Sequence, residues 1–175
     1  MRLFYKVSES LKDPHFLLLV ILSILTNVLV LSNILHSDYF GDDLYNFQAP
    51  GKVPHDYVSI SSYVFEAVIG WMGNGRFFPI SAGYMFYLFD WFDTLYSYKL
   101  AMMAIIMVSN LLFSYFVYLF SKKNRHIAIL VLLITPVLFQ YRLYHDPILS
   151  FHGVMPLLFS FLVISLIFLL KYLQE

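Results

Sequence analysis

The sequence predicts an all-α integral membrane protein, with about four transmembrane helices and amphipathic surface helices in a long first outer loop. Of its 175 residues, 60% are hydrophobic and only 13% are charged. Soluble domains are typically about half apolar and about a quarter charged, so this balance argues against a soluble protein. Several uncharged runs are also long enough to cross a hydrocarbon core of about 30 Å as helices.

Residues 16–35 form the first uncharged run, and its length of about twenty residues is what one transmembrane helix requires. A signal peptide is the alternative reading. The apolar part of a signal peptide is usually about 7–15 residues long and is followed by small residues at a cleavage site. This run is longer and no such site follows it, so a membrane span is favoured.

The remaining spans are expected at 100–120, 127–141 and 154–170, within a single membrane module that covers residues 1–175. The run at 127–141 is the shortest and contains Pro136, so it is expected either to kink or to cross only in part.

Basic residues set the predicted orientation. Alternating the spans places one group of them on a single side of the membrane: Arg2, Lys6, Lys12, Lys122, Lys123, Arg125 and Lys171. By the positive-inside rule that side is cytoplasmic, and both termini lie there. Residues 36–99 and 142–153 then form outer loops, and a bacterial plasma membrane is the expected location.

The first outer loop is expected to hold two helical elements. Apolar residues recur at helical spacing over 57–71 with serines between them, which is typical of an amphipathic helix on a membrane surface. The sequence Gly73-Asn74-Gly75 should end that helix. Residues 79–92 form a second apolar element, which is too short to cross a membrane and is rich in interfacial aromatics.

Carboxylates gather on the predicted outer side, although acidic residues contribute little to membrane topology. They are Asp38, Asp42, Asp43, Asp56, Glu66, Asp90, Asp93 and Asp146. An outward-facing acidic site is one cause of such a bias. The net charge is zero and cysteine is absent, so neither nucleic-acid binding nor a cysteine-ligated metal is indicated.

Two motifs of the first outer loop are candidates for chemistry. Asp42 and Asp43 are adjacent carboxylates soon after the first span, and their mutual repulsion calls for a compensating benefit. A solvated pair or a helix N-cap is the structural alternative. Arg76 is a candidate for holding an anionic group such as phosphate, the alternative being an arginine that reaches the lipid headgroups.

The second outer loop carries a third group of ionisable residues, next to two predicted spans. Its members are Arg142, His145, Asp146 and His152. A polar loop with Asp-Pro turn chemistry is the structural alternative. Together with the first-loop residues, this group could bind a divalent cation, or activate a hydroxyl and hold a phosphate.

In this order, the features resemble the GT-C superfamily of membrane glycosyltransferases. The shared features are a first span, an acidic pair soon after it, surface helices, further spans and a second acidic site. The run from Asp42-Asp43 to the motif between Trp71 and Pro79 is most similar to the O-antigen glucosyltransferase type. Complete members carry more spans, so the resemblance implies a glycosyltransferase or its N-terminal module, as a fragment, a truncated gene product or a small protein built from the conserved module alone.

The resemblance implies transfer of a sugar from a polyprenyl-phosphate donor to an acceptor hydroxyl of a glycan or lipid-linked molecule, with inversion. Asp42 or Asp43 would be the general base, with Asp42 slightly favoured. Arg76 and Arg142 would stabilise the phosphate leaving group. Asp146 would match the second acidic site and, with His145, is the candidate metal site; a requirement for Mg²⁺ or Mn²⁺ stays open.

Two other function classes fit the composition. A non-catalytic membrane subunit could bind polyprenyl-phosphate lipid, or scaffold a complex, with the same residues. A small transporter component is disfavoured, because transporters usually place charges within their spans.

Overall fold

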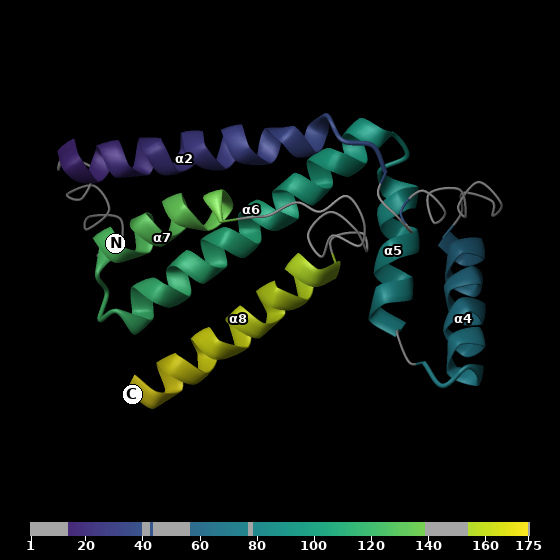
Figure 1. The fold of residues 1–175 in the computed structure, drawn as a ribbon. Coiled ribbons are helices and arrows are strands. Elements are labelled where there is room, and N and C mark those ends of the chain that lie inside the picture. The colour runs from purple at the N-terminus through teal and green to yellow at the C-terminus, as the bar shows by residue number, and fades with distance from the viewer. Residues whose placement is uncertain (1–13, 40–42, 44–56, 77–78, 139–153, 175) are drawn as a thin grey trace. The chain divides into compact units, whose positions relative to one another are not determined.

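The computed structural model describes residues 14–39, 43, 57–76, 79–138 and 154–174, and these residues contain helices and no strand. The helices are α2 (Pro14–Leu35), α4 (Tyr57–Gly73), α5 (Pro79–Trp91), α6 (Leu95–Phe120), α7 (Arg125–Val137) and α8 (Val154–Gln174) (Figure 1). The all-α prediction is therefore confirmed for the part of the chain that is described.

Among the described residues, three helices are long and apolar enough to cross a membrane: Pro14–Leu35, Leu95–Phe120 and Val154–Leu173. They expose many large apolar side chains, including Leu29 and Phe168. Exposed apolar surface of this extent suits contact with lipid, so the chain is a membrane protein. Helix α7 has only 13 residues, which at about 1.5 Å per residue is shorter than a hydrocarbon core of about 30 Å.

Contacts divide the chain into two compact units. We call residues 1–33, 106–140 and 157–175 the bundle unit, and residues 34–105 and 141–156 the aromatic unit. Each is described separately below.

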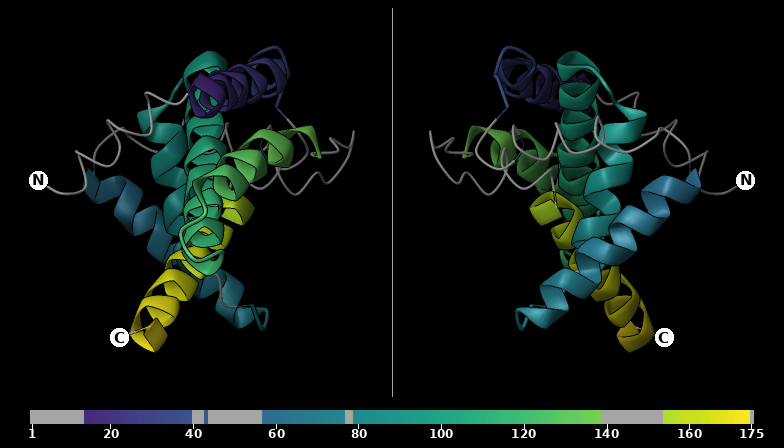
Figure 2. Two further views of the ribbon diagram at one scale, coloured as in Figure 1. Left: turned by 90° about the vertical axis from the view of Figure 1, so that its left-hand side faces the viewer. Right: turned by 90° about the vertical axis from the view of Figure 1, so that its right-hand side faces the viewer.

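In the bundle unit, α7 lies beside both α2 and α6 (Figures 1 and 2) and is joined to them by side chains that donate to its carbonyls. Ser23 Oγ of α2 donates to the Ile129 carbonyl at 3.1 Å, and Ser114 Oγ of α6 donates to the Ala128 carbonyl at 2.7 Å. Small polar residues of this kind commonly join membrane helices, because they allow close approach and add hydrogen bonds.

Pro136 explains a further hydrogen bond in which a side chain of a neighbouring helix donates to a carbonyl of α7. Proline has no N–H, so the Leu132 carbonyl loses the donor that a regular helix would supply four residues later. Asn27 Nδ2 of α2 donates to that carbonyl at 2.9 Å, and Asn27 Oδ1 accepts from Asn110 Nδ2 of α6 at 3.2 Å. A neighbouring helix thus satisfies the acceptor that Pro136 leaves open, and α7 continues to Val137.

Helix α8 packs against α6 within the same unit. The hydroxyls of Ser109 and Ser160 are 3.0 Å apart and hydrogen-bonded. Buried Leu119, Val163 and Ile167 form an apolar cluster beside them.

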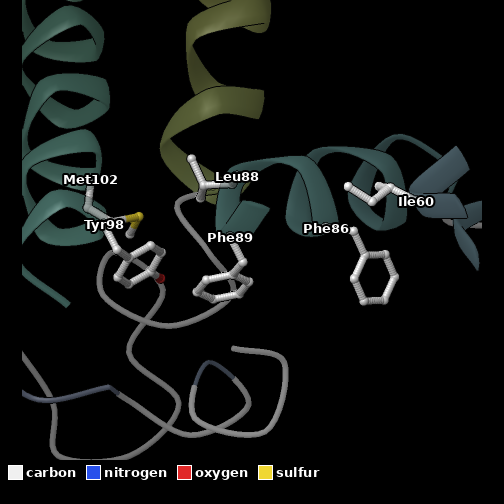
Figure 3. Close-up of a cluster of buried hydrophobic side chains, with 6 residues drawn as sticks. All are labelled: Ile60, Phe86, Leu88, Phe89, Tyr98 and Met102. Carbon is white, nitrogen blue, oxygen red and sulfur yellow. The ribbon is translucent and has the colours of Figure 1, made fainter. Parts of the chain in front are cut away.

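In the aromatic unit, α4 and α5 lie side by side (Figure 1). The hydroxyls of Ser61 and Tyr87 are hydrogen-bonded at 2.6 Å, and the rings of Tyr63 and Phe86 meet edge to face at 4.7 Å between centroids. The core of this unit consists of Ile60, Phe86, Leu88, Phe89, Tyr98 and Met102 (Figure 3). Three helices therefore contribute to one aromatic-rich core.

Helix α4 ends at Gly73, within the Gly-Asn-Gly sequence that was expected to break it. Gly75 has φ of 73°, and its N–H donates to Met72 while the N–H of Arg76 donates to Trp71. This is a Schellman motif, in which glycine takes the left-handed position without a steric penalty.

Helix α6 begins at Leu95, earlier than the span expected at 100–120, because a cap fixes its start. Thr94 Oγ1 accepts from the N–H of Ser97 at 3.1 Å, and Ser97 Oγ accepts from the N–H of Thr94 at 3.2 Å. The earlier start places Tyr98 and Lys99 inside the helix. Lys99 thus lies in α6, directly before the uncharged run at 100–120.

We predict that Asn27→Leu lowers the free energy of unfolding by about 1–2 kcal/mol, because the Leu132 carbonyl is left without a donor. The measurement is reversible unfolding in mixed micelles. Asn33→Leu is the control, since exposed Asn33 bonds only to the nearby Val30 carbonyl among its described contacts.

In a Pro136→Ala background, the restored N–H at position 136 should satisfy Leu132, and Asn27→Leu should cost less. An equal cost in both backgrounds would contradict this account of α7.

Candidate functional site

Asp43 is the described member of the predicted acidic pair, and it is fully buried, with 0% of its surface exposed. The Tyr98 hydroxyl of α6 donates a hydrogen bond to Asp43 Oδ2. An ionised carboxylate away from water is tolerated only when it is hydrogen-bonded and balanced by charge. Tyr98 supplies the first of these conditions.

Lys99, the next residue of α6, is also buried, with 1% exposure. The carboxylates of Asp43 and Asp38 act on it electrostatically, and its Nζ lies 5.5 Å from the centroid of the Tyr98 ring. Lysine is almost never this buried unless it is paired with opposite charge. Consecutive residues of α6 thus offer Asp43 a hydroxyl donor and a cation.

Aromatic rings fix the position of the Tyr98 hydroxyl. The ring of Tyr98 stacks on Phe89 of α5 at 4.9 Å between centroids and meets Tyr39 at 5.5 Å. Figure 3 shows the rings of Phe89 and Tyr98 close together in the core. Because the ring is held from α5 and from the segment after α2, its hydroxyl has little freedom to leave the carboxylate.

Two further tyrosines respond to the Asp43 charge. Burial, with added effects of the carboxylates of Asp43 and Asp93, raises the pKa of Tyr39 to about 12. Burial and the Asp43 carboxylate likewise raise the pKa of Tyr84 above its ordinary value. Both phenols therefore remain neutral at physiological pH and keep a proton to donate.

The Tyr84 hydroxyl is buried, and the described residues provide no hydrogen-bond partner for it. A buried hydroxyl of this kind usually finds a donor or an acceptor. The Tyr84 hydroxyl belongs to the same unit as Asp43 and adds a group there that can donate or accept a hydrogen bond.

Of the other predicted site residues, only Arg76 is described, as an exposed residue of the turn that ends α4. The remaining ones, Asp42, Arg142, His145 and Asp146, lie outside the described residues. The structure therefore brings Asp43 together with Tyr98 and Lys99, and it does not describe the predicted grouping of the two acidic loops.

Within the described ranges, no group of three or more His, Cys, Asp or Glu side chains is arranged to hold a metal ion. The predicted metal residues, His145 and Asp146, lie outside the described residues. The metal requirement stays open.

Tyr98, Lys99, Tyr39 and Tyr84 were not predicted as site residues. For Lys99 a signal was available, because a lysine directly before an uncharged run of membrane-spanning length is unusual enough to mark a candidate site. The tyrosines gave no such signal, since the chain has 14 of them and interfacial tyrosine is common in membrane proteins.

Comparisons with protein-family models, with curated proteins and with solved structures gave no match to this chain. The roles of its residues therefore have to be argued from its own chemistry and from the sequence motifs.

We predict that Tyr98→Phe lowers the free energy of unfolding by about 2 kcal/mol, because it removes the donor of a buried carboxylate and leaves the ring packing in place. Tyr84→Phe is the matched control. It removes a buried hydroxyl that has no partner in the described part of the chain, so it should be neutral or slightly stabilising.

Unfolding of both variants in mixed micelles gives the comparison. Equal losses for the two hydroxyls would mean that the Tyr98–Asp43 bond contributes nothing of its own.

Proposed function

We propose that the chain is a membrane glycosyltransferase module of the GT-C type. It transfers a sugar from a polyprenyl-phosphate donor to an acceptor hydroxyl on the outer face of the membrane. The oxygen of the acceptor attacks the anomeric carbon, a carboxylate takes its proton, and the polyprenyl phosphate leaves. A single displacement of this kind inverts the configuration at the sugar.

The observation that carries the proposal is the buried carboxylate of Asp43, which accepts a hydrogen bond from Tyr98 and acts electrostatically on the buried side chain of Lys99. A solvated pair of loop aspartates would need neither a buried donor nor a buried cation. Buried ionisable groups with specific charge partners are more common at functional sites than elsewhere.

Asp42 and Asp43 take different roles in this proposal. The Asp43 carboxylate already accepts a hydrogen bond from Tyr98, which holds it in place. Asp43 then anchors the segment, and Asp42, its neighbour in the chain, acts as the general base. A base fixed in position next to the attacking hydroxyl contributes typically about 10²–10⁴-fold to rate.

Arg76 and Arg142 are proposed to stabilise the phosphate on which negative charge accumulates as the bond to the sugar breaks. Arg76 is exposed in the turn that ends α4, a position from which a guanidinium can reach a lipid phosphate. His145 and Asp146 remain the candidates for a divalent cation, if the reaction uses one.

The proposal includes the finer topology. Helix α7 with the residues that follow it would form a fourth span, and α4 would lie along the outer membrane surface. In support of the latter, α4 exposes Phe65, Ile69 and Met72 at helical spacing, on a side other than that of core residue Ile60. Such an apolar stripe suits the boundary between headgroups and acyl chains of a bacterial plasma membrane.

Full burial of Asp43 favours one second candidate, a non-catalytic subunit that binds polyprenyl-phosphate lipid. In that case the Asp43–Tyr98 bond serves only to hold the segment after α2. The two candidates differ in whether loss of the carboxylates abolishes sugar transfer or leaves a lipid-binding protein unchanged.

We predict that Asp42→Asn/Asp43→Asn reduces sugar transfer at least about a hundredfold, because the general base is lost. The assay follows release of sugar from a radiolabelled polyprenyl-phosphate sugar by membranes that contain the chain. Glu66→Gln is the control, since it removes an exposed carboxylate of α4 in the same predicted outer loop.

The single variants separate the two roles. Asp42→Asn should retain the wild-type free energy of unfolding and lose transfer, whereas Asp43→Asn should change both. Transfer at the wild-type rate by the double variant would refute the catalytic assignment. No transfer by correctly inserted wild-type protein would favour the lipid-binding subunit.

A further inference from the structure

The turn between α6 and α7 has an unusual backbone. Lys122 and Lys123 have φ of 55° and 65°, in the left-handed region that side chains with a Cβ rarely adopt. The N–H of Lys123 donates to the Tyr118 carbonyl at 2.8 Å, which closes the end of α6. Both lysines are exposed, so packing of their side chains does not account for the conformation.

The end of α4 supplies an internal comparison. There the N–H of Arg76 donates to the Trp71 carbonyl at 2.9 Å, the same pattern across the helix end, and the left-handed position is occupied by Gly75. Glycine is the usual residue at that position, because it has no Cβ. At the end of α6 the chain has Lys122 in its place, although glycine would fit the backbone better.

Other cationic and aromatic side chains lie close to this turn. The Arg125 guanidinium lies 4.9 Å from the centroid of the Phe16 ring, and the ring of His126 meets Phe16 edge to face at 5.9 Å. Phe120, the last residue of α6, is 70% exposed. The start of α2, the end of α6 and the start of α7 thus present cations beside aromatic rings, a combination typical of the headgroup level of a membrane.

The described residues of the bundle unit include no Asp or Glu. Lys122 and Lys123 are both exposed and place two adjacent positive charges at the end of α6. Groups of basic residues at the ends of membrane helices bind anionic lipid headgroups in this way.

We propose that the turn from Ser121 to Asn124 is a binding site for the phosphate of an anionic glycerophospholipid. Lys122 and Lys123, which are both exposed on the left-handed turn, supply the charge. This site is independent of the proposed sugar transfer.

The test compares thermal unfolding midpoints of the full chain in neutral detergent, with phosphatidylglycerol or phosphatidylcholine added. Phosphatidylglycerol should raise the midpoint of the wild type by several degrees, because a ligand that binds only the folded state stabilises it. Phosphatidylcholine should raise it much less. Equal effects of the two lipids would overturn the proposal.

The variant Lys122→Gly/Lys123→Gly separates strain from binding. In neutral detergent its midpoint should equal or exceed that of the wild type, because glycine adopts the left-handed conformation readily. The increment from phosphatidylglycerol should be lost. If glycine impairs folding, Lys122→Asn/Lys123→Asn serves the same purpose, since asparagine also tolerates this region.

Two controls define the specificity. Lys171→Gln removes a cation near the end of α8, where Nζ lies 5.9 Å from the centroid of the Tyr115 ring, and it should keep the increment. Lys122→Arg/Lys123→Arg should keep it as well. The proposal fails if the increment survives in the glycine variant, if Lys171→Gln abolishes it equally, or if inorganic phosphate reproduces it in full.

Discussion

A carboxylate that is removed from water needs a hydrogen-bond donor and a balancing charge, and Asp43 obtains both from consecutive residues of α6. Tyr98 donates its hydroxyl, and Lys99 provides the buried cation on which Asp43 and Asp38 act. Removal of one member of such a group leaves an uncompensated charge in a dry surrounding, which is usually far more costly than the interaction is favourable. The rings of Tyr39 and Phe89 pack against the Tyr98 ring and hold it in place.

The two units stabilise their buried polar groups in different ways. The aromatic unit buries charge and compensates for it, whereas the described bundle unit uses neutral side chains that donate to carbonyls of a neighbouring helix. Asn27 is the clearest example, because it replaces the donor that Pro136 removes from α7. Neutral pairs suit helices that only need to be held together. A compensated carboxylate costs more to bury, which is why we associate it with function.

Much of the fold could be predicted from the sequence. The long uncharged runs predicted the positions of α2 and α8 closely, and the Gly-Asn-Gly sequence predicted where α4 ends. The start of α6 was missed, because counting uncharged residues ignores the cap made by Thr94 and Ser97. Asp43 could be selected from the sequence because adjacent carboxylates are conspicuous. Its partners could not, because contacts between residues 55 positions apart depend on tertiary packing that no local pattern records.

The central claim is that Asp43 and Lys99 compensate each other inside the aromatic unit. A double-mutant cycle tests it most directly, with unfolding free energies measured for Asp43→Asn, for Lys99→Met and for the two combined. Compensation predicts that each single variant is strongly destabilised, since it leaves the other charge unbalanced, and that the combined variant loses much less than the sum. Losses that simply add would show that the two charges are independent, and would contradict the account.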